Sequence, residues 1–490
     1  MIVLAAVSMA SAQDQSKLGA DFSGEGQRFS KSCGSFSFSA VPGCTELLFT
    51  DHPLHVAVGS IAPQNGFGAG LALVTHYTPN ENWRLSWNTD AVGSINGSWR
   101  AGMYMTAILT TPRKETTTRG RPDPNHKPGL VSLERPEFHL YAQTITLNKI
   151  DYFGLGPSTT LGDRSFYGMR ETIPGANVWW PIFEPLHISL FGELNGRFVD
   201  IRASPGQESP SIEHLYTEAT APGLVTQPGF LQLGEGIRLR PVILQLNLRF
   251  NYFVAFQEFV APSNSKFTFQ RFSADLLHEF PLYSTTRNLY PVAGNGPDDC
   301  STAVTASAPT TAASSPPASL PTPASEPSKD VAKPAQKLAN PCPRVTRNRE
   351  GRIGFRFFLS ESFTQDGHVV PFYFQSTLGG GDINGSPSLS SYQDYRFRAP
   401  NVMLLRENFD HSIFGPLGFA FIADQGKVAL TLGDLTSSPW IHSFSAGFTL
   451  RAGGYPQVFL LFSWGGKEGT HTIANVNTSL LGGAARPSLY

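Results

Sequence analysis

Apolar and polar residues alternate along much of this chain with a period of two. Between Leu244 and Tyr252 every second residue is leucine, phenylalanine or tyrosine, and amides and one arginine stand between them. Similar alternation recurs in segments 99–105, 186–190, 353–360 and 444–451. Because successive side chains of a β-strand point to opposite faces, this period predicts strands with one apolar and one polar face.

The two faces differ in a way that decides between fold classes. Large apolar groups gather on one face, whereas arginines and small residues gather on the other, as in Ile353–Ser360 and Phe444–Arg451. A soluble sandwich also alternates, but the chain offers no second amphipathic element to cover the large apolar groups. Lipid outside and a wet, crowded lumen inside would accommodate both faces. The pattern therefore predicts an all-β fold, a transmembrane antiparallel β-barrel.

Sixteen strands are predicted, and an even number brings both ends of the barrel sheet to the same side of the membrane. The predicted ranges are 54–62, 66–77, 82–92, 97–109, 137–148, 151–160, 165–178, 185–200, 237–257, 266–282, 352–364, 395–409, 415–425, 441–452, 457–466 and 471–481. The range 237–257 is long enough to project beyond the bilayer. Counting strands back from the C-terminal strand places the link before 352–364 on the periplasmic side.

Composition agrees with a chain that meets lipid. Charged residues make up 15% of the sequence and apolar residues 40%, whereas soluble domains usually carry about 25% charge. No stretch approaches the ~18 consecutive apolar residues of a spanning helix. A net charge of −1 argues against a nucleic-acid partner. The partners expected instead are outer-membrane lipid and lipopolysaccharide.

The sequence carries no recognised catalytic, cofactor or metal motif. GxSxG, HExxH, GxxxxGK[ST] and CxxC are all absent. Gly66-Phe-Gly-Ala-Gly70 resembles a phosphate loop only superficially, because it opens a strand and no helix follows. A lipase-like barrel would need a Ser–His pair on facing strands, which spacing alone does not test. We therefore expect no enzyme and no cofactor.

Four segments make up the predicted domain organisation. Residues 1–12 are typical of the end of a secretory signal peptide with Ala10-Ser-Ala12 as its cleavage pattern, although a buried N-terminal strand is the alternative. An N-terminal extension covers 13–53, and the barrel covers 54–490. A disordered insertion at 296–345, rich in proline, alanine, serine and threonine, interrupts the barrel.

The cysteines are placed as candidates for disulfides. Cys33 and Cys44 lie close together in the extension, while Cys300 and Cys342 flank the proline-rich stretch. No histidine cluster stands beside them, so disulfides are favoured over metal sites. A bridge between Cys300 and Cys342 would close the base of the insertion and leave the adjoining strands undisturbed.

Several segments in the second half of the chain occur in a recognisable order. They are Leu378-Gly-Gly-Gly381, Leu389-Ser-Ser-Tyr392, Tyr395-Arg-Phe-Arg398 and Phe421-Ile-Ala-Asp-Gln-Gly-Lys-Val428. Earlier, Asp151-Tyr-Phe-Gly-Leu-Gly156 and Asp163-Arg-Ser-Phe166 fit the same order. Together they resemble the bacterial surface antigen family, the sixteen-stranded barrels of outer-membrane protein assembly factors and two-partner secretion transporters. The resemblance covers residues 54–490 in outline and is most specific from 351 to 428.

The resemblance implies a loop that folds back into the lumen. In the family an arginine at the tip of the sixth outer loop meets an aspartate on a neighbouring strand. Asp424 matches that aspartate and Tyr392 the aromatic residue of the tip, but Ser390 stands at the arginine position and Ser391 at the glycine position. Arg396 and Arg398 share the predicted inward face with Asp424. We therefore expect one of these arginines to replace the missing partner of Asp424; the alternative is that both arginines are solvated in a wet lumen.

The resemblance also implies a place and a function. It predicts a protein of the bacterial outer membrane that assists insertion or translocation of proteins or lipids through a weak seam between its first and last strands. The family's N-terminal periplasmic repeat domains do not fit into residues 13–53, so a separate periplasmic partner would recruit clients. A passive channel or a structural outer-membrane protein is the alternative.

Overall fold

The computed structural model describes the barrel region and little else of the chain. It covers residues 53–110, 134–204, 210–243, 248–288, 346–452, 455–476 and 487–489, and besides these only Ser23, Gly24 and Gln27. The signal-peptide region, most of the N-terminal extension, the proline-rich insertion and all the cysteines lie outside the described residues. The predictions made for them stay predictions.

Most described residues belong to strands. The strands are β1 (Leu54–Ser60), β2 (Phe67–Asn80), β3 (Trp83–Ser94), β4 (Trp99–Leu109), β5 (Glu137–Tyr152), β6 (Ser165–Phe183), β7 (Ile188–Ala203), β8 (Phe230–Leu239), β9 (Val242–Ile243), β10 (Leu248–Val260), β11 (Phe269–Asn288), β12 (Thr346–Phe363), β13 (Ser376–Leu378), β14 (Gly380–Gly381), β15 (Pro387–Ser388), β16 (Phe397–Ala399), β17 (Asn401–Phe414), β18 (Leu417–Ala429), β19 (Ile441–Ala452), β20 (Tyr455–Gly466) and β21 (Gly469–Val476).

The helices are short and lie in the links between strands. They are the α-helices α3 (Ile212–Leu215) and α4 (Leu432–Ser437) and the 3-10 turns Leu161–Asp163, Glu184–Leu186, Ser265–Phe267 and Phe372–Phe374. Among the described residues, no helix is both long and apolar enough to cross a membrane.

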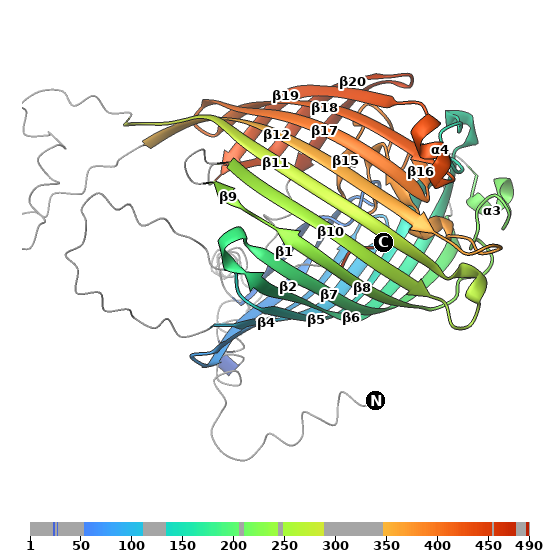
Figure 1. Ribbon diagram of the computed structural model, residues 1–490, viewed down its shortest axis with the longest axis horizontal. Coiled ribbons are helices and arrows are strands. Elements are labelled where there is room, and N and C mark those ends of the chain that lie inside the picture. Colours follow the sequence, from blue (N-terminus) through green and yellow to red (C-terminus); the bar gives the residue numbers. More distant parts are fainter. Residues whose placement is uncertain are drawn as a thin grey trace, which may run out of the picture.

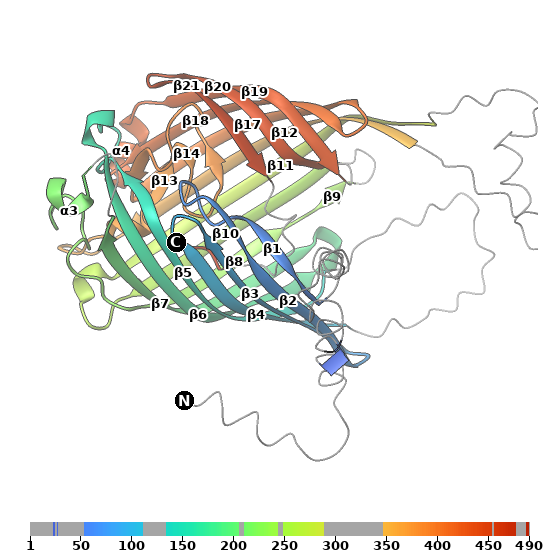
Figure 2. The same cartoon turned by 180° about the vertical axis from the view of Figure 1, so that it is seen from behind.

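One large antiparallel sheet contains 17 of the strands and curls into a barrel (Figures 1 and 2). Each strand pairs with its neighbours along the chain, with β12 passing directly to β17. Strands β8 and β9 both pair with β10, so they act as one interrupted strand and the barrel wall has sixteen. The predicted fold class and strand number are therefore confirmed.

Three of the predicted strand ranges were wrong, and the errors compensate in the count. The range 151–160 is no strand, because β5 ends at Tyr152 and the chain turns. The range 237–257 is not one projecting strand, because β8 and β9 run back antiparallel to β10. The range 395–409 joins β16 to the beginning of β17. Alternation continues through a tight turn, so periodicity alone does not locate such breaks.

The strand direction defines two ends of the barrel. At the terminal end, β1 begins and β21 ends; at the opposite end, which we call the loop end, lie α3 and α4 (Figure 1). Because β11 runs toward the terminal end, the link 289–345 leaves the wall there, as the strand count predicts. The link between β12 and β17, residues 364–400, leaves from the loop end; we call it the inward loop.

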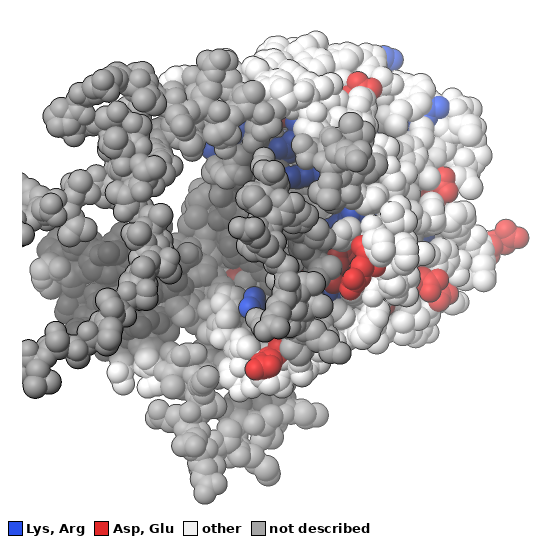
Figure 3. Space-filling model, turned by 60° about the vertical axis from the view of Figure 1, so that its left-hand side comes forward, with Lys and Arg blue, Asp and Glu red and all other residues white. Residues whose placement is uncertain are grey.

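The two faces of the wall differ as the alternation predicts. Outward side chains include Trp99, Phe198, Phe355 and Phe448, which are 37–56% exposed. Inward positions carry buried polar and charged groups, among them Asp90, Arg100, Gln143, Glu171, Arg197, Gln232, Arg271, Asp410, Asp424 and Thr449. In Figure 3 most of the visible outer wall is free of charged side chains. An apolar outside around a polar inside is the arrangement of a barrel that spans a lipid bilayer.

Candidate functional site

The inward loop lies inside the barrel and is the most deeply buried link of the described chain. From Val370 to Ala399 nearly every residue is buried or half-buried. The loop contains two short hairpin-like ladders, β13 with β16 and β14 with β15. These ladders satisfy part of the loop's backbone inside the lumen, where unpaired polar groups would be costly. The loop is thus a built structure, and we treat its contacts with the wall as the candidate site.

The base of the inward loop is an aromatic cluster. Phe372, Tyr373 and Phe374 form one 3-10 turn and are at most 2% exposed. The Phe372 ring lies edge-on to Tyr152 of β5 at 5.2 Å and to Tyr167 of β6 at 5.1 Å between ring centroids. Edge-to-face rings at such distances attract beyond their burial. The base therefore packs onto the wall as a small hydrophobic core would.

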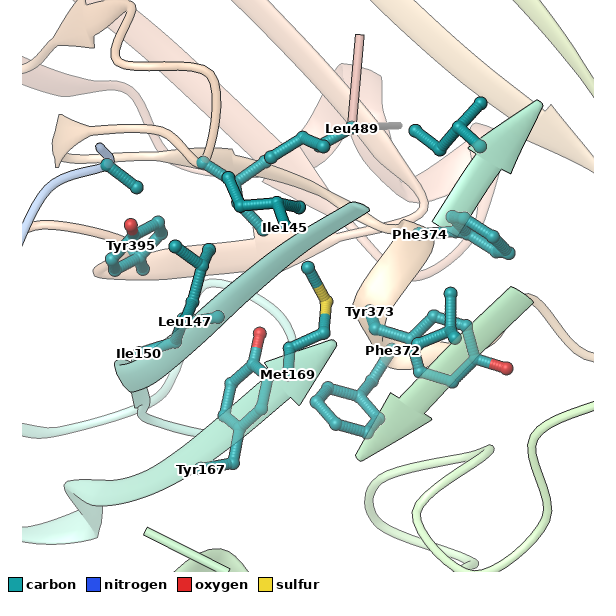
Figure 4. Packing of buried hydrophobic residues seen from close by; sticks show 14 of the residues in the cluster. Ile145, Leu147, Ile150, Tyr167, Met169, Phe372, Tyr373, Phe374, Tyr395 and Leu489 are labelled. Atoms are coloured by element: carbon teal, nitrogen blue, oxygen red, sulfur yellow. The ribbon is translucent and has the colours of Figure 1, made fainter. Parts of the chain in front are cut away.

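The same aromatic turn also contacts β8 and β10, which follow β6 and β7 in the wall. Phe374 lies 5.4 Å from Phe259 of β10 and 5.0 Å from Phe230 of β8, again between ring centroids. Figure 4 shows Phe372, Tyr373 and Phe374 facing residues of β5 and β6 such as Ile145, Tyr167 and Met169, and they form one buried cluster. The loop base thereby contacts a continuous stretch of the wall from β5 to β10.

Two inward arginines hold the carbonyl groups of this aromatic turn. Arg398 donates from Nη1 to the Phe372 carbonyl at 2.8 Å and from Nη2 to the Tyr167 hydroxyl at 3.2 Å. Arg271 of β11 donates to the Phe374 carbonyl. Both guanidinium groups also lie over aromatic rings, which favours a cation there. Arg398 is therefore a residue of the loop base and has no contact with Asp424.

Arg396 binds a different part of the loop end. Its Nε donates to Glu468, in the turn between β20 and β21, at 2.6 Å. Its Nη1 and Nη2 donate to the Thr159 hydroxyl and carbonyl at 2.8 and 2.7 Å. The expectation that Arg396 or Arg398 pairs with Asp424 was thus wrong. Both arginines do point inward, but they lie in or beside β16 of the loop and not on the wall.

Asp424 is paired with an arginine of the wall. Arg406 stands directly opposite it on β17, and the two form a bidentate pair with Nε–Oδ1 and Nη2–Oδ2 distances of 2.6 and 2.8 Å. Asp424 is 1% exposed, so an unpaired carboxylate there would be costly. Alternation puts Arg406 on the same face as Arg396 and Arg398. The register of β17 against β18 places Arg406 opposite Asp424. The alternation of the sequence does not specify that register.

The tip of the inward loop is anchored through its backbone. The Leu389 N–H donates to Asp424 Oδ2 at 2.8 Å, and the Ser391 N–H donates to the Ser443 hydroxyl of β19 at 2.8 Å. Leu389 has a φ of 43°, a left-handed conformation that leucine rarely adopts. The bond to Asp424 fixes this backbone. Where the family pattern has an arginine side chain, this chain uses amide groups of Leu389-Ser-Ser391.

Apolar contacts close around the tip. Leu378, Leu389 and Tyr392 pack with Phe397, Val402 and Ile441 in a second buried cluster. A Cβ at Gly426 would lie only 2.8 Å from Leu378 Cδ1 and 3.2 Å from Leu389 Cδ1, so the glycine leaves room for the loop. Tyr392, predicted as the aromatic residue of the tip, is 7% exposed and lies edge-on to Phe397.

The two mid-chain segments of the resemblance meet at the loop end. Arg164 donates to Asp151 at 3.0 Å, and Gln64, from the link between β1 and β2, donates to the same carboxylate at 2.8 Å. The Gly156 N–H donates to the Arg398 carbonyl at 2.8 Å. Sequence pieces recognised separately therefore converge on the inward loop.

The described residues contain no cluster of His, Cys, Asp and Glu that could hold a metal ion. The residues brought together at the site are ion pairs, backbone donors and aromatic rings. Their chemistry is that of positioning a loop within a lumen.

No family model matches the chain, and no curated protein matches it. Among solved structures, CdiB from Acinetobacter baumannii is similar over 86% of this chain and 58% of that chain, at 10% identity and a TM-score of 0.45. BamA from Haemophilus ducreyi lacking POTRA domains 1–3 is similar over 86% of this chain and 66% of that chain, at 10% identity and a TM-score of 0.43. This chain therefore spans about 58–66% of the length of these neighbours.

The assignment to a fold class rests on the chain's own strand pairing and on the polarity of its two faces. On those grounds, the protein is a sixteen-stranded transmembrane β-barrel with an inward-folded loop.

Proposed function

We propose that this chain is a surface-antigen-type barrel of the bacterial outer membrane that assists the insertion or translocation of polypeptides. Its apolar belt contacts outer-membrane lipid and lipopolysaccharide, and a separate periplasmic partner recruits its clients. The observation that supports this proposal is the strand pairing of β1 and β21, the first and last strands of the sheet.

The first and last wall strands are the weak point of the sheet. Within the described residues, β1 pairs only with β2 and β21 only with β20, while every other wall strand has partners on both sides. Unpaired backbone groups facing lipid are costly. Such edges favour pairing with an added strand, which is the recognition mode a client strand would use.

The filled lumen supports this function over passive conduction. The inward loop packs against β5, β6, β8 and β10 through Phe372 and Phe374, and its tip reaches Asp424 in the middle of β18. A wide aqueous pore would leave this space to water. The loop would instead support the barrel while the seam between β1 and β21 opens.

Depletion followed by quantitative proteomics of the outer membrane tests the proposal. We expect other outer-membrane barrels to decline and periplasmic stress markers to rise, because unassembled clients accumulate. Intact levels of other barrels with altered solute permeability would contradict the proposal and support a passive channel. Intact levels with unchanged permeability would support a structural role.

Complementation sharpens the result. Wild-type protein and the lipid-face variant Phe355→Ala should both restore the proteome, because Phe355 lies outside the lumen and the seam. A variant whose β1 and β21 edges are joined by engineered cysteines should assemble but restore the proteome only after reduction. Restoration by the oxidised form would argue against lateral opening.

A further inference from the structure

A short segment from the end of the described chain lies inside the barrel, apart from β21. Pro487, Ser488 and Leu489 are placed in the lumen, and Leu489 is 5% exposed. Figure 4 shows Leu489 in the same buried cluster as Ile145 of β5 and Phe374 of the inward loop. Nothing in the proposed function requires this placement, so the contacts of the segment need their own explanation.

On one side the segment meets a buried arginine of the wall. Arg197 of β7 is 1% exposed, and its Nη2 donates to the Ser488 carbonyl at 2.7 Å. Its Nη1 donates to Glu171 of β6 at 2.7 Å, and its Nε donates to Gln232 of β8. Two side-chain contacts thus fix the guanidinium, and its Nη2 is left to donate to the peptide carbonyl. A buried arginine held in this way is pre-organised for such an acceptor.

On the other side the segment meets the turn between β14 and β15 of the inward loop. The Leu489 N–H donates to Asn384 Oδ1 at 2.8 Å, and Asn384 Nδ2 donates to the Ser488 hydroxyl at 3.3 Å. Asn384 is itself positioned in a turn, where its own N–H donates to Asp382 at 2.9 Å. The segment therefore connects the wall at β7 with the β14–β15 turn of the inward loop.

The two sides together bind main-chain groups. Arg197 donates to the carbonyl of Ser488, and Asn384 accepts from the N–H of Leu489. The Leu489 side chain packs into an apolar cluster. A short peptide presents a carbonyl acceptor, an N–H donor and one apolar side chain, and it does so whatever its other side chains are. Recognition of backbone groups with a pocket for one side chain is a general mode of peptide binding.

We propose that the lumen contains a peptide-binding site formed by Arg197, Asn384 and the apolar cluster around Ile145 and Phe374, and that Pro487–Leu489 is its internal ligand. The bound segment ties the inward loop to the wall. Its release frees the site for another peptide with an apolar side chain at the Leu489 position. This inference does not depend on the client or on opening of the seam.

Peptide exchange tests the proposal directly. The probe is a fluorescent peptide of residues 485–490, Ala-Arg-Pro-Ser-Leu-Tyr, added to purified barrel in detergent and followed by anisotropy. A barrel truncated after residue 484 should bind it saturably, and the full chain should bind it at least tenfold more weakly because the site is occupied. Equal binding to both proteins, or none to the truncated one, would overturn the proposal.

Variants of the truncated barrel assign the binding to this site. Asn384→Ala should lower the affinity for the peptide about tenfold, which corresponds to the loss of one well-made hydrogen bond. Arg197→Met combined with Glu171→Gln should weaken it at least as much, without leaving a buried carboxylate unpaired. Arg202→Met is the matched control, since Arg202 lies on the same strand but reaches Asn148. Retained affinity in both site variants would place binding elsewhere and refute the assignment.

Cross-linking reports occupancy in the full chain even if a site variant folds poorly. In a background with the four native cysteines changed to serine, Asn384→Cys with Ser488→Cys should form a disulfide, because the two side chains approach to 3.3 Å. The control pair is Asn384→Cys with Thr436→Cys on α4, which should stay reduced. A disulfide in the control but not in the test pair would contradict the placement of the segment.

Discussion

The base and the tip of the inward loop are held by different forces. At the base, Phe372 and Phe374 bury whole aromatic rings against the wall, and arginines hold their carbonyls. At the tip, the amides of Leu389 and Ser391 bind side chains of β18 and β19. Burial of an aromatic side chain contributes several kcal/mol, whereas one hydrogen bond contributes about 1 kcal/mol net. The base therefore stabilises the loop, and the tip sets its position.

This difference bears on what each part can do. The base of the loop packs against aromatic rings of several strands, so it cannot move unless those rings repack. The tip buries a smaller apolar cluster around Leu389 and adds a few hydrogen bonds to it, so its release should cost less than repacking the base. If the loop rearranges during function, the rearrangement should begin at the tip. The predictions below test this contrast, in order of decreasing effect.

Removal of a base ring should have the largest effect. Phe372→Ala deletes a fully buried ring that contacts Tyr152 and Tyr167, so we expect a loss of about 3–5 kcal/mol in unfolding free energy. The measurement is urea unfolding in detergent, with the shift between folded and boiled bands on gels as a second readout. Phe355→Ala on the lipid face is the control and should cost clearly less. Equal costs would mean that the loop base does not pack as a core.

The ion pair at the tip should come next. Asp424→Ala should cost about 2–4 kcal/mol, because it leaves Arg406 half-buried without its carboxylate and Leu389 without an acceptor. A double-mutant cycle should show coupling of Asp424 with Arg406→Met and additive effects with Arg396→Ala and Arg398→Ala. Coupling to Arg396 or Arg398 that exceeds coupling to Arg406 would contradict the pairing.

One hydroxyl at the tip should matter less. Ser443→Ala removes the acceptor of the Ser391 N–H and should cost about 1 kcal/mol. If the tip is released locally, proteolysis or cysteine labelling within 386–392 should become faster, while the base of the loop stays protected. Ser445→Ala, whose hydroxyl bonds Ser463 across the neighbouring strand pair, is the matched control. Release of base and tip together in Ser443→Ala would show that the loop moves as one body.

The smallest expected effect is a pH dependence at Asp394. Burial raises the pKa of this carboxyl above its ordinary value of 3.8, although the Gly381 N–H donates to it. The folded protein therefore favours the neutral acid, and its stability contribution is largest below 3.8 and falls as pH rises through the raised pKa. Asp394→Asn keeps an oxygen for Gly381 and should slightly stabilise the barrel at neutral pH. A steeper pH dependence in the variant would contradict this sign.

The sequence by itself determined the wall. Alternation predicted the class of fold and the face of the residues within the strands, because strand geometry assigns side chains to faces with a fixed period. The predicted strand number agreed because one range too many offset one strand missed. It also predicted the inward loop, through the resemblance of segments such as Leu389–Tyr392 and Asp424 to a family. Those features depend only on local geometry or on residue order.

Tertiary structure alone decided which inward residues meet. Arg396, Arg398 and Arg406 share one parity, but register pairs Arg406 with Asp424, while the loop carries the other two to Glu468 and Phe372. Likewise, no spacing connects Arg197 with Ser488, which are 291 positions apart. Periodicity states the face on which a side chain lies, whereas contacts across a lumen depend on how far each strand is shifted and where a loop folds back.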